Sequence, residues 1–180
     1  LFNPYDYLEA QLGRPVDRAE IRAKRKPRYE ELMATQSVLP GVRDYIADAR
    51  RLGLKLGLAS SSSRAWVTGY LSQLGLNGSG PAGAPTFDCI CCGDEVERTK
   101  PDPVLYGLAL DALGLRPGQA IALEDSLNGV VAAKRAGLFC VVVPSALTRH
   151  FSFDQADLRL NSLADLPLEK LLWEVERNGR

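Results

Sequence analysis

Short apolar runs alternate with amphipathic segments through most of this chain. The runs predict strands at 54–59 (LKLGLA), 87–92 (FDCICC), 120–124 (AIALE) and 139–143 (FCVVV), and a shorter strand is predicted at 157–160. The amphipathic segments predict helices at 42–51, 63–75, 102–114, 126–136 and 164–177. Strands that are apolar along their whole length and separated by helices are typical of a parallel sheet covered on both faces. Residues 39–180 are therefore predicted to form a doubly wound α/β core.

The first 38 residues lie outside this alternation. Charged residues interrupted by spaced apolar ones predict helices at 5–12 and 17–36. Pro27 should kink the second helix or start a new one, because proline removes a backbone donor. The sequence Leu39-Pro40-Gly41 then predicts a break in the chain. Residues 1–38 are expected to be a separate, partial helical piece.

Composition narrows the function classes. The 180 residues contain 22 Lys plus Arg and 22 Asp plus Glu, so no overall charge favours nucleic acid or an anionic membrane. No apolar run approaches the ~20 residues that span a bilayer, and no signal peptide opens the chain. A cytoplasmic protein, monomeric rather than oligomeric, is expected. The chain begins at Leu1 and Met33 is its only methionine, so we expect a fragment of a longer protein.

Three features of the sequence have plainer interpretations than their spelling suggests. In a strand, alternation would turn Cys89 and Cys91 away from Cys92, so buried free thiols are favoured over a metal site. GSGPAG at 78–83 matches a dinucleotide fingerprint, but it follows a helix and contains a proline, so a flexible loop is expected. A solvated helix face is favoured over phosphate or nucleic-acid binding for one basic cluster: Arg14, Arg18, Arg22, Lys24, Arg25, Lys26 and Arg28.

Polar residues follow three of the predicted strands. Ser60 to Ser63 follow the first, Lys100 lies in TKPDP after the second, and Glu124-Asp125 end the third. Ligands of open parallel sheets lie beyond the carboxyl ends of the strands, where these groups would meet. A hydroxyl donor, a fixed cation and hard oxygen ligands for Mg²⁺ form a set suited to phosphoryl transfer.

Each of these residues also has a structural alternative. Ser60 could cap the following helix, Lys100 could be an ordinary surface lysine, and Asp125 could cap the helix after it, with Glu124 aiding the helix dipole. The functional interpretation is favoured because the residues occur as a set at successive strand ends.

At these positions the sequence resembles the haloacid dehalogenase-like hydrolase superfamily, in its beta-phosphoglucomutase-like branch. LGLASSSSRAWV is similar to the second family motif, ERTKPDPVLY to the third and IALEDSLNGVVAAKRAG to the fourth. The resemblance implies a Rossmann-like core with a helical cap, phosphate binding by Ser60, Ser61 and Lys100, and catalytic roles for Ser60 and Lys100. It further implies that Glu124 and Asp125 hold Mg²⁺ and that the substrate is a small phosphorylated metabolite.

One family motif has no counterpart in this sequence. The first motif, Asp-x-Asp-Gly, supplies the nucleophilic aspartate, so the first strand of the core is expected to lie upstream of this chain. The expected function of the intact parent is a Mg²⁺-dependent phosphatase or phosphomutase that forms an aspartyl-phosphate. The alternatives are a non-catalytic module that binds phosphate or metal, a dehalogenase, which the acidic pair disfavours, and a nucleotide-dependent oxidoreductase.

Overall fold

The computed structural model describes residues 4–78 and 85–178, so most of the loop expected at 78–83 lies outside the described residues. The chain divides into two compact units, Leu1–Ser37 and Val38–Arg180. No helix within the described ranges is long and apolar enough to cross a membrane.

The first unit contains two helices, α1 (Pro4–Leu12) and α2 (Arg18–Ala34). Asp17 caps α2 by accepting hydrogen bonds from two backbone N–H groups in its first turn. Arg18 ties the two helices together, because its guanidinium contacts Asp6 at 2.6 Å and Glu9 at 2.5 Å. Helix α2 continues through Pro27, so no new helix starts there. Neither helix contains a buried residue, and the basic residues of α2 are exposed or paired with neighbouring carboxylates.

The second unit is a parallel α/β core, which confirms the predicted fold class. Its strands are β1 (Gly57–Ser60), β2 (Cys89–Cys92), β3 (Ile121–Glu124), β4 (Phe139–Val142) and β5 (Leu158–Arg159). Its α-helices are α3 (Val42–Arg51), α4 (Arg64–Gln73), α5 (Val104–Leu113), α6 (Leu127–Arg135) and α7 (Leu168–Asn178). Short 3₁₀ turns lie at Gly93–Glu95, Pro117–Gln119 and Leu163–Asp165.

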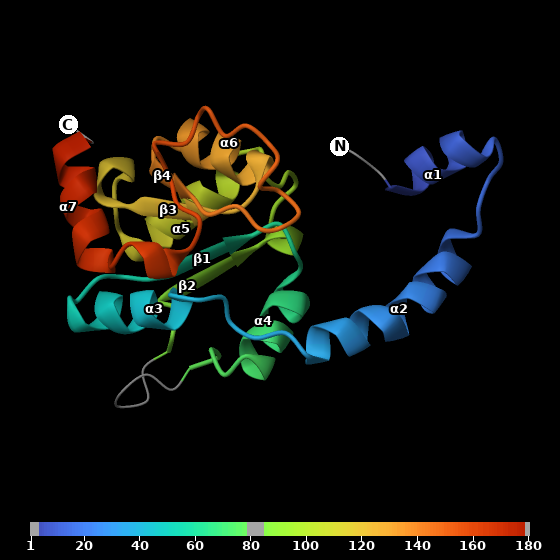
Figure 1. The fold of residues 1–180 in the computed structure, drawn as a ribbon, viewed down its shortest axis with the longest axis horizontal. Coiled ribbons are helices and arrows are strands. Elements are labelled where there is room, and N and C mark those ends of the chain that lie inside the picture. The colour runs from blue at the N-terminus through green and yellow to red at the C-terminus, as the bar shows by residue number, and fades with distance from the viewer. Residues whose placement is uncertain (1–3, 79–84, 179–180) are drawn as a thin grey trace. The chain divides into compact units, whose positions relative to one another are not determined.

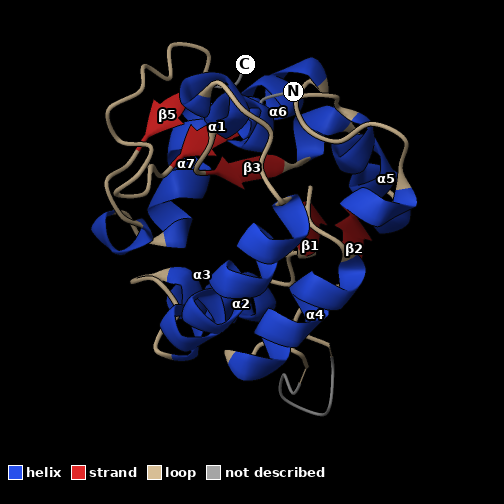
Figure 2. Ribbon diagram, turned by 90° about the vertical axis from the view of Figure 1, so that its right-hand side faces the viewer, coloured by secondary structure: helices blue, strands red, loops and turns tan. Residues whose placement is uncertain are grey.

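The strands form two separate sheets (Figures 1 and 2). Strand β1 pairs in parallel with β2, and the second sheet has the order β3-β4-β5, also parallel. In the described residues, β1 is therefore hydrogen-bonded to a strand on one edge only, and so is β3. In a doubly wound sheet the ligand site lies beyond the carboxyl ends of the strands, where the strand order changes. We therefore expect the site next to the unpaired edges of β1 and β3.

Helices cover both faces of the strands. Helices α5 and α6 pack on one face through Tyr106, Leu110, Val130 and Ala133. On the other face, α3 and α7 cover the three-stranded sheet, while α4 covers β2. Cys91 faces α5 and Cys92 faces the α4 side, which confirms the predicted alternation, and all four cysteines are free thiols.

Two strands begin later than the apolar runs predict. The first was expected from Leu54 but begins at Gly57, and the second was expected from Phe87 but begins at Cys89. The cause is Asp88, whose carboxylate accepts the Leu56 backbone N–H at 2.6 Å and pairs with Arg50 at 2.9 Å. A side chain therefore takes the place of a ladder hydrogen bond at this end of the sheet.

Candidate active site

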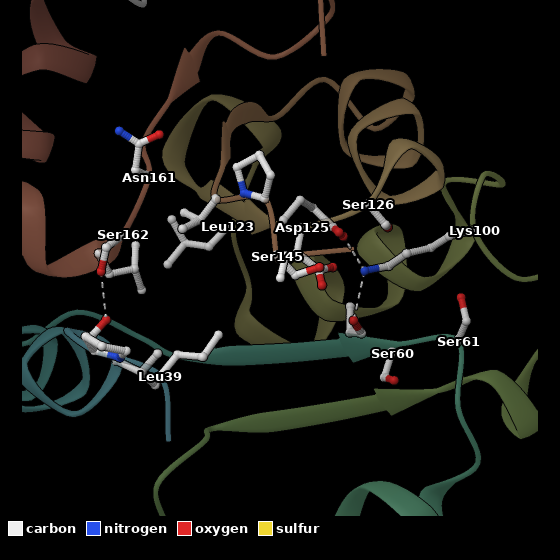
Figure 3. A pocket seen from close by; sticks show the side chains of 18 of the residues that line it. Leu39, Ser60, Ser61, Lys100, Leu123, Asp125, Ser126, Ser145, Asn161 and Ser162 are labelled. Atoms are coloured by element: carbon white, nitrogen blue, oxygen red, sulfur yellow. Dashed lines mark hydrogen bonds and ion pairs between the residues drawn. The ribbon is translucent and has the colours of Figure 1, made fainter. Parts of the chain in front are cut away.

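A cavity of about 780 Å³ opens at the carboxyl ends of β1 and β3 (Figure 3). It brings together every site residue predicted from the sequence: Ser60, Ser61, Lys100, Glu124 and Asp125. Further polar groups on its wall come from Ser126, Ser145, Asn161 and Ser162. The cavity lies between the open edges of the two sheets, so residues far apart in the sequence meet there.

Lys100 spans the break between the two sheets. Its ammonium donates to the Ala59 carbonyl of β1 at 2.9 Å and contacts the Glu124 carboxylate of β3 at 2.5 Å. Only 11% of its side chain is exposed. An ordinary surface lysine is therefore excluded, because desolvating an ammonium is costly unless acceptors of this kind hold it.

The loop around Lys100 is anchored on both sides. Arg135 at the end of α6 donates to the Pro101 carbonyl at 3.0 Å. Asp102 accepts the Val104 N–H at 3.1 Å where α5 begins, and it pairs with Arg98. The ammonium of Lys100 is thus carried by a loop that is tied to two helices.

Glu124 and Asp125 have different surroundings although they are adjacent. Glu124 is 8% exposed, and its Oε1 accepts hydrogen bonds from Lys100 and from the Tyr106 hydroxyl, each at 2.5 Å. Its other oxygen faces Gly129, which leaves no room for a side chain there. Asp125 is exposed toward the cavity. Lys100 and Tyr106 both occupy Oε1 of the buried Glu124, so Asp125 presents the more available carboxylate.

The electrostatics of Asp125 favour a cation nearby. Partial burial raises the pKa of Asp125, the negative charge of Glu124 raises it further, and Lys100 opposes the shift. Its backbone carbonyl accepts the Thr148 hydroxyl at 2.7 Å, which fixes the main chain. A divalent cation would relieve the repulsion between the two carboxylates.

No group of three or more His, Cys, Asp or Glu side chains that could hold a metal occurs in the described ranges. Mg²⁺ fits this poor donor set, because it commonly binds one or two carboxylates and keeps several waters.

The serines after β1 are held by local hydrogen bonds. Ser60 Oγ accepts the Ser62 N–H at 3.2 Å, and its side chain points away from Lys100 in Figure 3. Ser61 is exposed, and its carbonyl lies so close to Gly93 that a Cβ there would come within 2.2 Å. Ser63 is the N-cap of α4 and Ser126 is the N-cap of α6. The capping alternatives for Ser60 and Asp125 are therefore wrong.

Three residues at the site were missed from the sequence. Tyr106 and Gly129 contact Glu124, and Thr148 contacts the backbone of Asp125. Tyr106 lies in the apolar stretch VLYGLALDAL, where an aromatic residue is usually a core residue. Gly129, three residues after the N-cap position of a helix, carried the best available signal, because glycine is unfavourable within helices.

Comparisons with known proteins agree with this geometry. The model of the haloacid dehalogenase-like hydrolase family matches residues 4–137. The chain is 43% identical over 171 residues to YhcW of Bacillus subtilis (strain 168), covering 95% of this chain and 74% of that protein. It is 34% identical over 139 residues to hexitol phosphatase B of Escherichia coli (strain K12), covering 77% of this chain and 60% of that enzyme.

Solved structures give the same assignment. The crystal structure of a CbbY mutant from Rhodobacter sphaeroides in complex with xylulose-(1,5)-bisphosphate is similar at a TM-score of 0.72 and 40% identity, covering 87% of this chain and 70% of that one. The family match extends over most of the chain and includes the cavity residues from Leu39 to Ser126. This chain belongs to the haloacid dehalogenase-like hydrolases.

Proposed function

We propose that this chain is the larger part of a Mg²⁺-dependent phosphatase or phosphomutase that acts on a small phosphorylated metabolite. The observation that carries the proposal is the buried Lys100 ammonium, which joins β1 to β3 beside the exposed carboxylate of Asp125. A fixed cation next to a carboxylate at a sheet's carboxyl edge suits a dianionic phosphate ester. Similarity to hexitol phosphatase B, and to a CbbY mutant in complex with xylulose-(1,5)-bisphosphate, supports sugar or polyol phosphates as substrates.

Each residue of the site has a role in this proposal. Lys100 donates to the phosphoryl oxygens and stabilises the charge that develops on them. Asp125, backed by Glu124, would hold Mg²⁺, which supplies charge neutralisation and orients the phosphate. The N–H groups of the Ser60–Ser61 turn and the exposed Ser61 hydroxyl would bind the phosphate on the other side of the cavity, and the Ser60 hydroxyl would have to rotate from its bond with Ser62 to join them.

The nucleophile is proposed to come from outside these 180 residues. Strands β1 and β3 have facing open edges, and a strand carrying Asp-x-Asp would pair with both of them. One aspartate oxygen would bond to phosphorus as the ester oxygen leaves with a proton from the second aspartate. Water would then release inorganic phosphate from the aspartyl-phosphate, or a sugar hydroxyl would accept the phosphoryl group in a mutase.

The test is hydrolysis of a panel of pentose bisphosphates, hexose phosphates and hexitol phosphates by the full-length protein. Removing Mg²⁺ with a chelator should abolish turnover. Asp125→Asn should lower kcat by at least ~10²-fold, since preorganised electrostatics is usually the largest catalytic contribution. Asp111→Asn is the matched control, because Asp111 is exposed on α5 and does not line the cavity.

Two outcomes would overturn parts of this proposal. Hydrolysis that survives both the chelator and Asp125→Asn would rule out the metal role of the acidic pair. Binding of inorganic phosphate without hydrolysis of any ester in the panel would favour a non-catalytic binding module instead.

A further inference from the structure

Tyr106 lies beneath the ion pair at the centre of the site. It is the third residue of α5, and only 9% of it is exposed. Its hydroxyl donates to Glu124 Oε1, the same oxygen that Lys100 contacts. The Lys100 ammonium also lies 4.6 Å from the centre of the Tyr106 ring and 3.4 Å from its hydroxyl. One side chain therefore contacts both members of the pair.

The donor inventory explains what the phenol contributes. An ammonium has three N–H donors, and the Ala59 carbonyl and Glu124 accept two of them. The Tyr106 ring closes one side of the ammonium through a cation–π contact. The third donor points to the Tyr106 hydroxyl at 3.4 Å, a long contact that a phosphoryl oxygen in the cavity would replace.

The phenol also supports Glu124 in the same arrangement. Burial, together with the charge of Glu124, raises the pKa of Tyr106, so the hydroxyl stays a donor at any physiological pH. Its hydrogen bond satisfies part of the Glu124 charge. Without it, that oxygen would have Lys100 as its only hydrogen-bond donor among the described residues.

We propose that Tyr106 is a positioning residue: its hydroxyl and ring fix the Lys100–Glu124 pair so that the ammonium stays directed at the phosphoryl site. The catalytic part of this inference rests on the proposed function. Packing alone would require only the ring, whereas positioning requires the hydroxyl as well.

The main experiment compares Tyr106→Phe with Tyr45→Phe in the full-length protein. Tyr45 is also buried, at 6% exposure, and its hydroxyl donates to the Leu166 carbonyl rather than to a member of the Lys100–Glu124 pair. Each variant loses one buried hydrogen bond and keeps the ring. Only Tyr106→Phe should lower kcat, by about tenfold, with KM nearly unchanged, because the lost interaction supports the transition state. Wild-type kcat in Tyr106→Phe, or an equal loss in both variants, would overturn the proposal.

A second readout does not depend on catalysis. The rate at which an amine-reactive ester labels Lys100 is measured by mass spectrometry, with Lys134 as the internal reference because it is paired with Asp157 elsewhere. Labelling of Lys100 should rise several-fold in Tyr106→Phe and stay constant in Tyr45→Phe. If the wild-type protein hydrolyses no phosphate ester, the proposed function fails, yet this labelling still decides whether Tyr106 positions Lys100. Unchanged labelling would refute the positioning role even in an active enzyme.

Discussion

Gly129 controls the position of the acidic pair by having no side chain. It lies in the first turn of α6, where its N–H donates to Ser126 Oγ at 3.1 Å. A Cβ at this position would lie 1.7 Å from Glu124 Oε2, far inside van der Waals contact. Glu124 is pinned on its other oxygen by Lys100 and Tyr106, so it has little freedom to move away.

Gly129→Ala should therefore destabilise the protein and reduce turnover, although alanine is the better helix former. Gly69→Ala is the matched control, because Gly69 is exposed within α4 and a Cβ there meets nothing within 4 Å. The control should gain up to ~1 kcal/mol in the free energy of unfolding from helix propensity. Thermal unfolding and phosphate-ester hydrolysis measure both effects. Equal stability of the two variants would show that Glu124 can relocate freely.

Sequence reasoning reached some of these residues and not others for a physical reason. Lys100, Glu124 and Asp125 could be placed because the carboxyl ends of parallel strands share one edge. Tyr106 and Gly129 could not, because their roles depend on which side chain lies opposite them across a helix–strand contact. Ser63 and Ser126, which cap helices, differ from Ser60 and Asp125 only by a few positions that the sequence pattern does not resolve.

At the scale of elements, β4 is the strand most deeply enclosed. Cys140 and Val142 face the side covered by α5 and α6, whereas Val141 faces α3 and α7. All three are 0% exposed. Continuous apolar runs predicted strands of this kind well. They failed at the ends: the Asp88 carboxylate takes the Leu56 N–H, and the Leu54 N–H bonds back to the Ala49 carbonyl of α3.

Because Cys140 is buried in β4, the free energy of unfolding should fall at alkaline pH. Burial raises the pKa of the Cys140 thiol from 9.0 to about 12, and the charges of Glu124 and Asp157 add to the shift. The folded state thus keeps a proton that the unfolded chain loses. The contribution of the protonated thiol to the free energy of unfolding is therefore complete below pH 9 and is lost as pH rises toward 12. Between about pH 8 and about pH 10.5 the free energy of unfolding should fall, with Cys140 contributing about 1–2 kcal/mol. Denaturant unfolding under reducing conditions measures it. Cys140→Ala should show a shallower fall, and an unchanged slope would exclude this thiol as the cause.

At the scale of the whole molecule, the break between β1 and β3 has the largest expected effect on stability. Room for one strand between two others requires ~9.5 Å, twice the strand spacing. Each buried backbone group left unpaired at such a break costs roughly 1–3 kcal/mol, against ~5–15 kcal/mol for the stability of a whole domain. The parallel direction of the strands followed from the α/β pattern. The break itself was expected only from the family resemblance, because no local pattern in the sequence marks a missing neighbour.

The 180-residue chain alone should therefore aggregate or unfold without a cooperative transition, and it should hydrolyse no phosphate ester. Extending it upstream with a segment that carries the proposed strand and its Asp-x-Asp should restore both properties. Thermal unfolding and Mg²⁺-dependent hydrolysis are compared for the two lengths. Cooperative unfolding together with hydrolysis by the shorter chain would place the nucleophile within residues 1–180.

Because the edges of β1 and β3 are open, the stability of this chain should depend on the concentration of any separate peptide that supplies the strand between them. A strand that enters from a separate molecule acts thermodynamically as a ligand of the folded state. By mass action, a peptide supplied at a hundredfold excess over its Kd adds about 2.7 kcal/mol to the free energy of unfolding. The melting temperature and the fraction of assembled sites would then both rise with peptide dose. If the full-length protein is cut just upstream of this chain, the detached strand becomes a separate peptide, and its concentration sets the fraction of the protein that is folded.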